Sequence, residues 1–287
     1  MTIYELLGAV HERYAPRSYL EIGIRRGLSL ALSRTRTVAV DPDFEITAEL
    51  ACDLRIVKVT SDEFFAQPAW EKHFPEGVVD LAFVDGLHHA ESALRDFINV
   101  ERRTAWTSVI LVDDVLPRTR ARAARERGEM TAWSGDVYKL RAVLARLRPD
   151  LLLLVLDTAP SGVLAVLGPD SENRVLEKQY DELVDELVQP DPQDVPVSVL
   201  RGDGALDPAV FSAGEVWGLL REARDSGLRR AEGWDAVRRA AASASHPAPL
   251  RAIPPACLDG CSALPTDEAR GPVRRGLQRF RRGLRSS

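Results

Sequence analysis

The sequence lacks any hydrophobic run long enough to cross a membrane. Its longest run occupies only residues 151–156 of the 287, whereas a membrane-spanning helix needs about 20 apolar residues. The first 15 residues also lack the basic start and unbroken apolar stretch of a secretion signal. We therefore expect no membrane span and a cytoplasmic location.

Cysteine is also scarce. The chain has three cysteines, Cys52, Cys257 and Cys261, and an odd, sparse set argues against a disulfide framework. Cys257 and Cys261 form a C-x3-C pair, but no second cysteine or histidine pair stands nearby to complete a zinc site. We expect neither disulfides nor structural zinc.

Positive charge is not in excess either. The formal net charge is -5, so electrostatics give no reason to expect a nucleic-acid partner. The tail at 274–285 is the exception, with six arginines and no acid. Such a tail is typical of a solvated, disordered end, and an anionic surface or a protein partner is the alternative.

Short apolar runs alternate with helical patterns through the first 168 residues. This alternation predicts a parallel sheet with helices on both faces, and the unbroken apolar strands fit a sheet covered on both sides. The last two runs are joined by too few residues for a parallel crossover, so they should form an antiparallel hairpin. We therefore expect an α/β fold with a Rossmann-like, seven-stranded, mostly parallel sheet. The expected strands lie at 18–23, 37–41, 56–60, 79–85, 107–114, 151–157 and 162–168.

Beyond the sheet, the pattern becomes mainly helical. We expect a first domain at 1–190 and a helical or irregular C-terminal extension at 191–287, ending in the basic tail. A homodimer contact through the added helices is possible in this arrangement.

A glycine motif, "YLEIGIRRGLSL", follows the first predicted strand. Gly23 permits a tight turn, Gly27 permits close approach of the backbone, and a helix beginning near Gly27 would offer amide donors. Asp41 ends the next strand, where a carboxylate can accept both hydroxyls of a ribose. The pattern indicates a nucleotide-type ligand. A plain strand–turn–helix with solvated acids is the alternative.

These features together resemble a class I S-adenosylmethionine-dependent methyltransferase over roughly residues 1–190. The stretch "FVDGLHH" followed by "VILVDD" further resembles the metal-dependent small-molecule O-methyltransferases, in both the catechol-type and the macrocin-type natural-product branches. The resemblance implies that S-adenosylmethionine is the cofactor and that the acceptor is a hydroxyl of a small molecule, such as a secondary metabolite or a sugar. The cofactor-binding positions are then Glu21, Gly23, Gly27, Ser29, Asp41, Ser61, Asp62 and Asp85.

The same resemblance implies a divalent cation, Mg²⁺ or Mn²⁺, on Asp85, Asp113 and Asp114. Asp114 stands where the catechol-type enzymes have asparagine, which keeps an oxygen ligand but adds negative charge. Physical chemistry supports such a site, because carboxylates at the ends of adjacent strands repel unless a cation neutralises them. The alternative is that Asp113 only caps a loop.

Two adjacent histidines follow Asp85. His88 stands at the offset where the catechol-type enzymes place their lysine base, and an imidazole with its ordinary pKa near 6.5 can accept a proton at neutral pH. His88 and Asp85 are therefore the predicted catalytic residues. His89 is a second-layer group, a metal ligand or a solvated residue.

An aromatic pair is the last candidate. Trp133 and Tyr138 flank a predicted helix start that contains Asp136 and Lys139, and they either line the acceptor pocket or are simply buried.

Three other functions stay open on the sequence. They are metal-independent O- or N-methylation, a non-methylating reaction such as hydroxylation on the same scaffold, and binding without catalysis.

Overall fold

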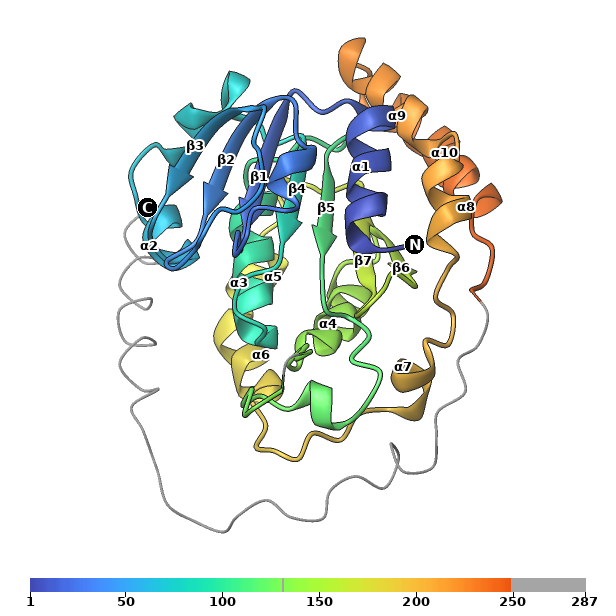
Figure 1. Ribbon diagram of the computed structural model, residues 1–287. Helices are drawn as coiled ribbons and strands as arrows, with labels where there is room; N and C mark the ends of the chain where they lie inside the picture. Colours follow the sequence, from blue (N-terminus) through green and yellow to red (C-terminus); the bar gives the residue numbers. More distant parts are fainter. Residues whose placement is uncertain (131, 249–287) are drawn as a thin grey trace.

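The computed structural model describes residues 1–130 and 132–248, and its centre is one seven-stranded sheet with helices on both faces (Figure 1). The strands lie in the order β3-β2-β1-β4-β5-β7-β6. This is the predicted fold class. Their bounds are β1 Ser18–Ile22, β2 Arg36–Val40, β3 Asp53–Val57, β4 Leu81–Val84, β5 Val109–Val112, β6 Leu152–Leu156 and β7 Val163–Leu167.

Strand β7 runs against its neighbours. It pairs antiparallel with both β5 and β6, while β1 to β5 pair in parallel. The expected hairpin of the last two strands is confirmed, and its antiparallel member lies inside the sheet with β6 at the edge. The central strands β1, β4, β5 and β7 are buried along their whole length, which explains their unbroken apolar sequences.

The helices divide between the two faces of the sheet. Alternate strand residues pack on one side against α3, α4 and α6, and on the other side against α1 and the late helices α8 to α10 (Figure 1). The α-helices are α1 Ile3–Tyr14, α2 Ser61–Phe65, α3 Ala90–Glu101, α4 Leu140–Leu147, α5 Val175–Lys178, α6 Tyr180–Leu187, α7 Val197–Arg201, α8 Pro208–Ala213, α9 Val216–Asp225 and α10 Arg230–Ser243. Short 3-10 turns are η1 Leu30–Leu32, η2 Trp70–His73, η3 Pro75–Gly77, η4 Ala121–Ala123 and η5 Val137–Lys139.

Helix α1 illustrates how the sequence sets the element. Thr2 and Glu5 form a reciprocal capping box at its start, which satisfies two backbone N–H groups that the helix leaves open. Its apolar residues recur at helical spacing and are buried against the sheet. The cap and the spacing of the apolar residues thus account for this helix.

The helix expected from Gly27 does not form. Arg25 and Gly27 both adopt left-handed backbone angles, with φ of 48° and 74°, and between β1 and β2, where every residue is described, the only helical turn is η1. Left-handed angles are incompatible with a right-handed α-helix at these two positions. The loop after β1 therefore contains no start of an α-helix whose N–H groups could bind a ligand.

The C-terminal extension, as far as it is described, packs into the main core. Trp217 and Phe211 are completely buried, in the same apolar cluster as β4, β5 and α1. Among the described residues, no helix is long and apolar enough to cross a membrane. Cys257, Cys261 and the arginine-rich tail lie outside the described residues.

Candidate active site

The candidate site lies where the strand order reverses. The central strands β1 and β4 are neighbours, and the chain leaves them towards opposite halves of the sheet. This is the place where open α/β sheets bind their ligands. The ends of β1, β4 and β5 are in register at Ile22, Val84 and Val112, so the residues that follow these strands meet at one edge.

Gly23 packs directly on the backbone of Asp85. Its φ is 91°, and a Cβ atom there would lie 1.9 Å from the carbonyl oxygen of Asp85. Only glycine fits such an approach. The loops after β1 and β4 are therefore held together without any side chain between them.

Glu21, on β1, supports the glycine loop through hydrogen bonds. Its buried carboxyl accepts hydrogen bonds from Ser29 Oγ at 2.6 Å and from the Tyr19 hydroxyl at 2.7 Å. Burial raises the pKa of Glu21 to about 8, although both hydrogen bonds act in the opposite direction. Glu21 and Ser29 thus fix the shape of the predicted cofactor loop.

Asp41 contacts the same loop from β2. Its carboxylate accepts from the backbone N–H groups of Ile24 at 2.7 Å and Arg25 at 3.0 Å, and from that of Asp43 at 2.7 Å. The structure thus places Asp41 beside the loop, with backbone amides as partners. Its role towards a ribose stays a prediction.

Ser61 and Asp62 begin α2, after β3. Asp62 forms an ion pair with Arg95 of α3, and Ser61 donates to the buried carboxyl of Asp96. Burial raises the pKa of Asp96 to about 7. Both predicted residues thus connect α2 to α3, and their contact with an adenosine stays a prediction.

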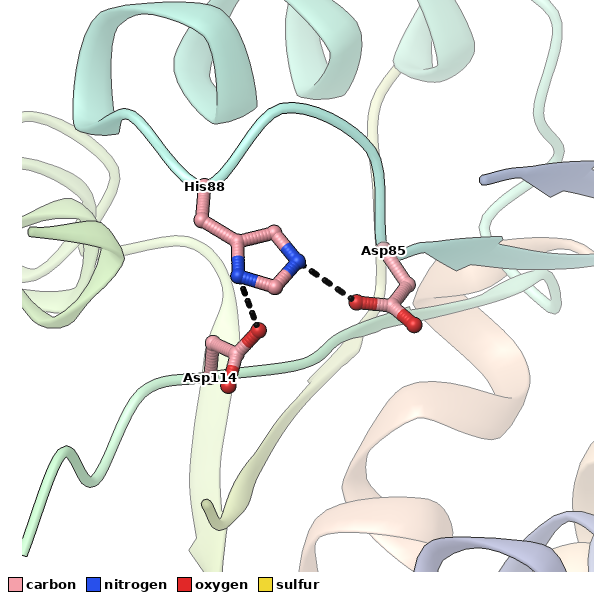
Figure 2. A group of neighbouring side chains, drawn as sticks. All are labelled: Asp85, His88 and Asp114. Carbon is pink, nitrogen blue, oxygen red and sulfur yellow. Dashed lines mark ion pairs between the residues drawn. The ribbon is translucent and has the colours of Figure 1, made fainter. Parts of the chain in front are cut away.

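Three side chains converge at the ends of β4 and β5 (Figure 2). The ring of His88 lies between two carboxylates, with Nδ1 3.0 Å from Asp114 Oδ2 and Nε2 3.4 Å from Asp85 Oδ1. One donor atom from each of the three lies within 4.8 Å of the others. The structure therefore brings Asp85, His88 and Asp114 into one group.

Asp113 lies beside this group but has other hydrogen-bond partners. Its Oδ1 accepts from Ser161 Oγ at 3.2 Å and from the backbone N–H of Asp114 at 2.7 Å. It lines the same small pocket as Asp85, His88 and Asp114, so its role as a metal ligand stays a prediction.

The His88 ring is held on several sides. It stacks on Trp133, with ring centroids 4.9 Å apart and planes 17° apart, and its Nδ1 also lies 3.0 Å from the Trp133 carbonyl oxygen. A Cβ on Gly135 would lie 1.7 Å from the His88 carbonyl oxygen. The position of the imidazole is thus fixed by packing as well as by charge.

The charges of the group change its protonation. Burial alone would lower the pKa of His88, but the hydrogen bond to Asp85 and the charges of Asp114 and Asp85 raise it to about 9. Burial and the neighbouring acids raise the pKa of Asp114 to about 6 and that of Asp113 well above its ordinary value. Without a bound cation, His88 is therefore protonated at neutral pH.

His89 and Tyr138 lie in the supporting structure. His89 Nε2 is 3.0 Å from the Arg125 carbonyl oxygen. Tyr138 packs in a small apolar cluster with Val195 and Leu200. Asp136 is completely buried and accepts from the first N–H of α3, at Ala90.

Two residues near the group were missed in the sequence. Tyr4 on α1 is 43% exposed, and its pKa is raised by burial and by the charges of Asp85 and Asp113. Arg122 lies close enough to Asp114 and Asp113 for their charges to raise its pKa, against a larger lowering by burial. In the sequence, Tyr4 stands out only by lying off the buried apolar face of α1. No feature of the sequence pointed to Arg122.

Part of the chain is similar to a known family. Residues 20–115, about a third of the chain, match the family model described as a methyltransferase domain. This segment is similar to methyltransferase domains. The match covers the glycine loop, Asp41 and the Asp85–Asp114 group, and it confirms the resemblance predicted from these motifs.

Solved structures give more distant likenesses. Cofactor-bound Rv0187 from MTB is 19% identical with a TM-score of 0.44, covering 59% of this chain and 82% of that one. The O-methyltransferase TomG from Streptomyces achromogenes, in complex with SAM, is 17% identical with a TM-score of 0.41, covering 58% and 79%. The SAH-bound methyltransferase PaMTH1 from Podospora anserina is 16% identical with a TM-score of 0.42, covering 58% and 78%. A search of curated proteins finds no match.

Proposed function

We propose that this protein transfers a methyl group from S-adenosylmethionine to a hydroxyl of a small molecule, with a divalent cation bound at Asp85 and Asp114. The observation that carries the proposal is the meeting of these two carboxylates and His88 beside the glycine loop, at the reversal of the strand order. The methyltransferase match over the same segment supports it.

The donor set fits a divalent cation. The carboxylates of Asp85 and Asp114 are oxygen donors of the kind that Mg²⁺ and Mn²⁺ prefer. A ring nitrogen of His88 lies within 4.8 Å of an oxygen of each, so the imidazole would stand beside the cation and keep a lone pair for its role as the base. The raised pKa of Asp114 shows that this position disfavours a bare negative charge. When bound, such a cation would supply Lewis acidity that lowers the pKa of a substrate hydroxyl.

Asp85 and His88 have different roles in the proposed reaction. The Asp85 backbone contacts the glycine loop and its carboxylate belongs to the acidic group, so an acceptor oxygen held there lies next to the cofactor. Placing the oxygen in line with the methyl group is itself a large part of catalysis. His88, stacked on Trp133, is the proposed base, and it needs the carboxylate charges neutralised before it can accept a proton.

A second candidate is the same reaction without metal. It is favoured by the position of His88, whose two ring nitrogens already face Asp85 and Asp114. In that case the imidazolium itself would balance the acids.

The experiment begins with calorimetric titration of S-adenosylhomocysteine, followed by Mg²⁺ and then Mn²⁺, into the wild-type protein. Methyl transfer to a panel of catechols, sugars and hydroxy acids is then followed by product mass, with and without a chelator. We expect cofactor binding, saturable cation binding and loss of turnover on chelation. Turnover that survives chelation would favour the metal-free candidate, a product heavier by one oxygen would favour hydroxylation, and failure to bind the cofactor would refute the proposal.

A further inference from the structure

We propose that Arg122 forms an anion-binding subsite beside the Asp85–His88–Asp114 group, so that the acceptor carries a carboxylate or phosphate as well as the hydroxyl to be methylated. The assignment of this anion to the acceptor rests on the proposed function above.

The subsite lies in an arginine-rich segment after β5. Residues 117–125 contain four arginines and no acid. Two of these arginines have structural partners: Arg118 pairs with Asp157, and Arg125 pairs with Glu91 and Asp136. These ion pairs balance part of the positive charge of the segment. Arg122 differs from Arg118 and Arg125 in the partners of its guanidinium.

The guanidinium of Arg122 has donors to spare. Its Nε is buried and has no hydrogen-bond partner in the described part of the chain, and its Nη2 lies 3.5 Å from Ser134 Oγ, at the limit of a hydrogen bond. The carboxylates of Asp114 and Asp113 lie close enough for their charges to act on Arg122, but within the described part of the chain neither forms a hydrogen bond with its guanidinium. A buried donor without an acceptor costs free energy, which a bound anion would recover.

The backbone around Arg122 is nevertheless fixed. Its carbonyl oxygen accepts from the N–H groups of Ser134 and Gly135, both at 3.0 Å, and its own N–H donates to Thr119 Oγ1 at 3.2 Å. Ser134 in turn donates to Asp114. Arg122 is thus tied to the segment that supports Asp114 and His88.

This position lies on the side away from the cofactor loop. Arg122 belongs to the chain that leaves β5, whereas the glycine loop leaves β1 on the other side of β4. A planar guanidinium with open donors binds carboxylate or phosphate through two parallel hydrogen bonds. An acidic group on the acceptor is the ligand that fits.

The test compares two probes that differ only in charge, 3,4-dihydroxybenzoate and 3,4-dihydroxybenzamide, titrated into the complex with S-adenosylhomocysteine and Mn²⁺. Inorganic phosphate is a third probe, and it needs neither a catechol nor a metal. The proteins are the wild type, Arg122→Gln, Arg122→Lys and the control Arg127→Gln, whose arginine is exposed just beyond this segment. Thermal unfolding checks that each variant folds.

We expect the wild type to bind the benzoate about tenfold or more tightly than the benzamide, as expected for hydrogen bonds to a charged group. Arg122→Gln should lose the preference for the benzoate and should lose phosphate binding, while its affinity for S-adenosylhomocysteine stays unchanged. Arg122→Lys should keep part of the benzoate preference and part of the phosphate binding. Arg127→Gln should keep the full benzoate preference and full phosphate binding. Equal affinity for the two probes without phosphate binding in the wild type, or an unchanged preference in Arg122→Gln, would overturn the subsite. Loss of S-adenosylhomocysteine binding by the wild type would refute the proposed function instead, and phosphate binding would still decide the subsite.

Discussion

The acidic residues near β1 and those near β5 have different kinds of partners. On the cofactor side, Glu21 and Asp41 receive hydrogen bonds from neighbouring hydroxyls and backbone amides. On the other side, Asp85 and Asp114 face each other across one imidazole, and burial together with mutual repulsion raises the pKa of Asp114. The first set shapes a loop, whereas the second set concentrates negative charge.

This difference distinguishes acids that stabilise a loop from acids that are available to bind a cation. A carboxylate whose lone pairs are filled by fixed donors gains little from a cation, whereas carboxylates that repel each other gain much. Perturbed acids of the second kind are typical of functional sites. The comparison predicts that changes at β4 and β5 affect chemistry, and that changes at β1 affect stability.

The largest effect is expected from Asp85→Asn, because the Asp85 carboxylate is one of the two that face His88. Removing one of the two converging charges should lower metal-dependent methyl transfer by about 1000-fold, because Lewis-acid assistance contributes several kcal/mol. Steady-state kinetics and cation calorimetry measure this loss.

Asp113→Asn is the matched control for that variant. Asp113 faces Ser161 rather than His88, and its raised pKa favours the neutral form that asparagine imitates. Its cation affinity should stay within about threefold of wild type, well under the tenfold that one pKa unit represents. Equal losses in the two variants would remove the distinction between these aspartates.

Gly23→Ala should give the next largest effect, this time on stability. The new Cβ would overlap the Asp85 carbonyl oxygen, and the residue would keep an unfavourable positive φ. We expect a loss of about 3 kcal/mol in the free energy of unfolding, measured by urea denaturation. Gly128→Ala, with no atom within 4 Å of the added Cβ, controls for the positive φ alone; equal losses in the two variants would show that contact with Asp85 is unimportant.

Glu21→Gln should give the smallest effect, and one that depends on pH. Because the pKa of Glu21 is raised to about 8 in the fold, the folded protein holds one more proton than the unfolded chain between its ordinary pKa of about 4.3 and 8. Wild-type stability should therefore fall as pH rises through this window.

Glutamine imitates the neutral acid and removes that decline. Relative to wild type, the variant should gain at least about 1.4 kcal/mol between pH 4 and pH 8, the equivalent of one pKa unit. Chemical denaturation at both pH values measures the gain. A constant difference between the two proteins would mean that the fold does not raise the pKa of Glu21.

The sheet was predictable because its strands are continuous apolar runs separated by turn residues. The resemblance to the metal-dependent O-methyltransferases selected Asp85 and the Asp113–Asp114 pair. The parallel order explains why residues that follow neighbouring strands meet at one edge of the sheet. Local pattern, topology and that resemblance were sufficient for these features.

Backbone angles and distant contacts were not predictable in this way. Nothing in "VILVDD" indicates that Asp114 takes a left-handed φ or that its carboxylate, rather than that of Asp113, lies 3.0 Å from His88. The left-handed Arg25 likewise removed the helix expected from Gly27. Tyr4 approaches the group only because α1 folds back over the sheet, a long-range packing event.

The packing of α9 against α1 has a consequence for how the protein is made. The face of the sheet that carries Phe83 and Leu111 is covered partly by Trp217 and Leu220, which follow the last strand in the sequence. On the ribosome, all seven strands leave the exit tunnel before these residues have been synthesised. That apolar face therefore stays open during translation, and chains released before α9 would expose it to aggregation.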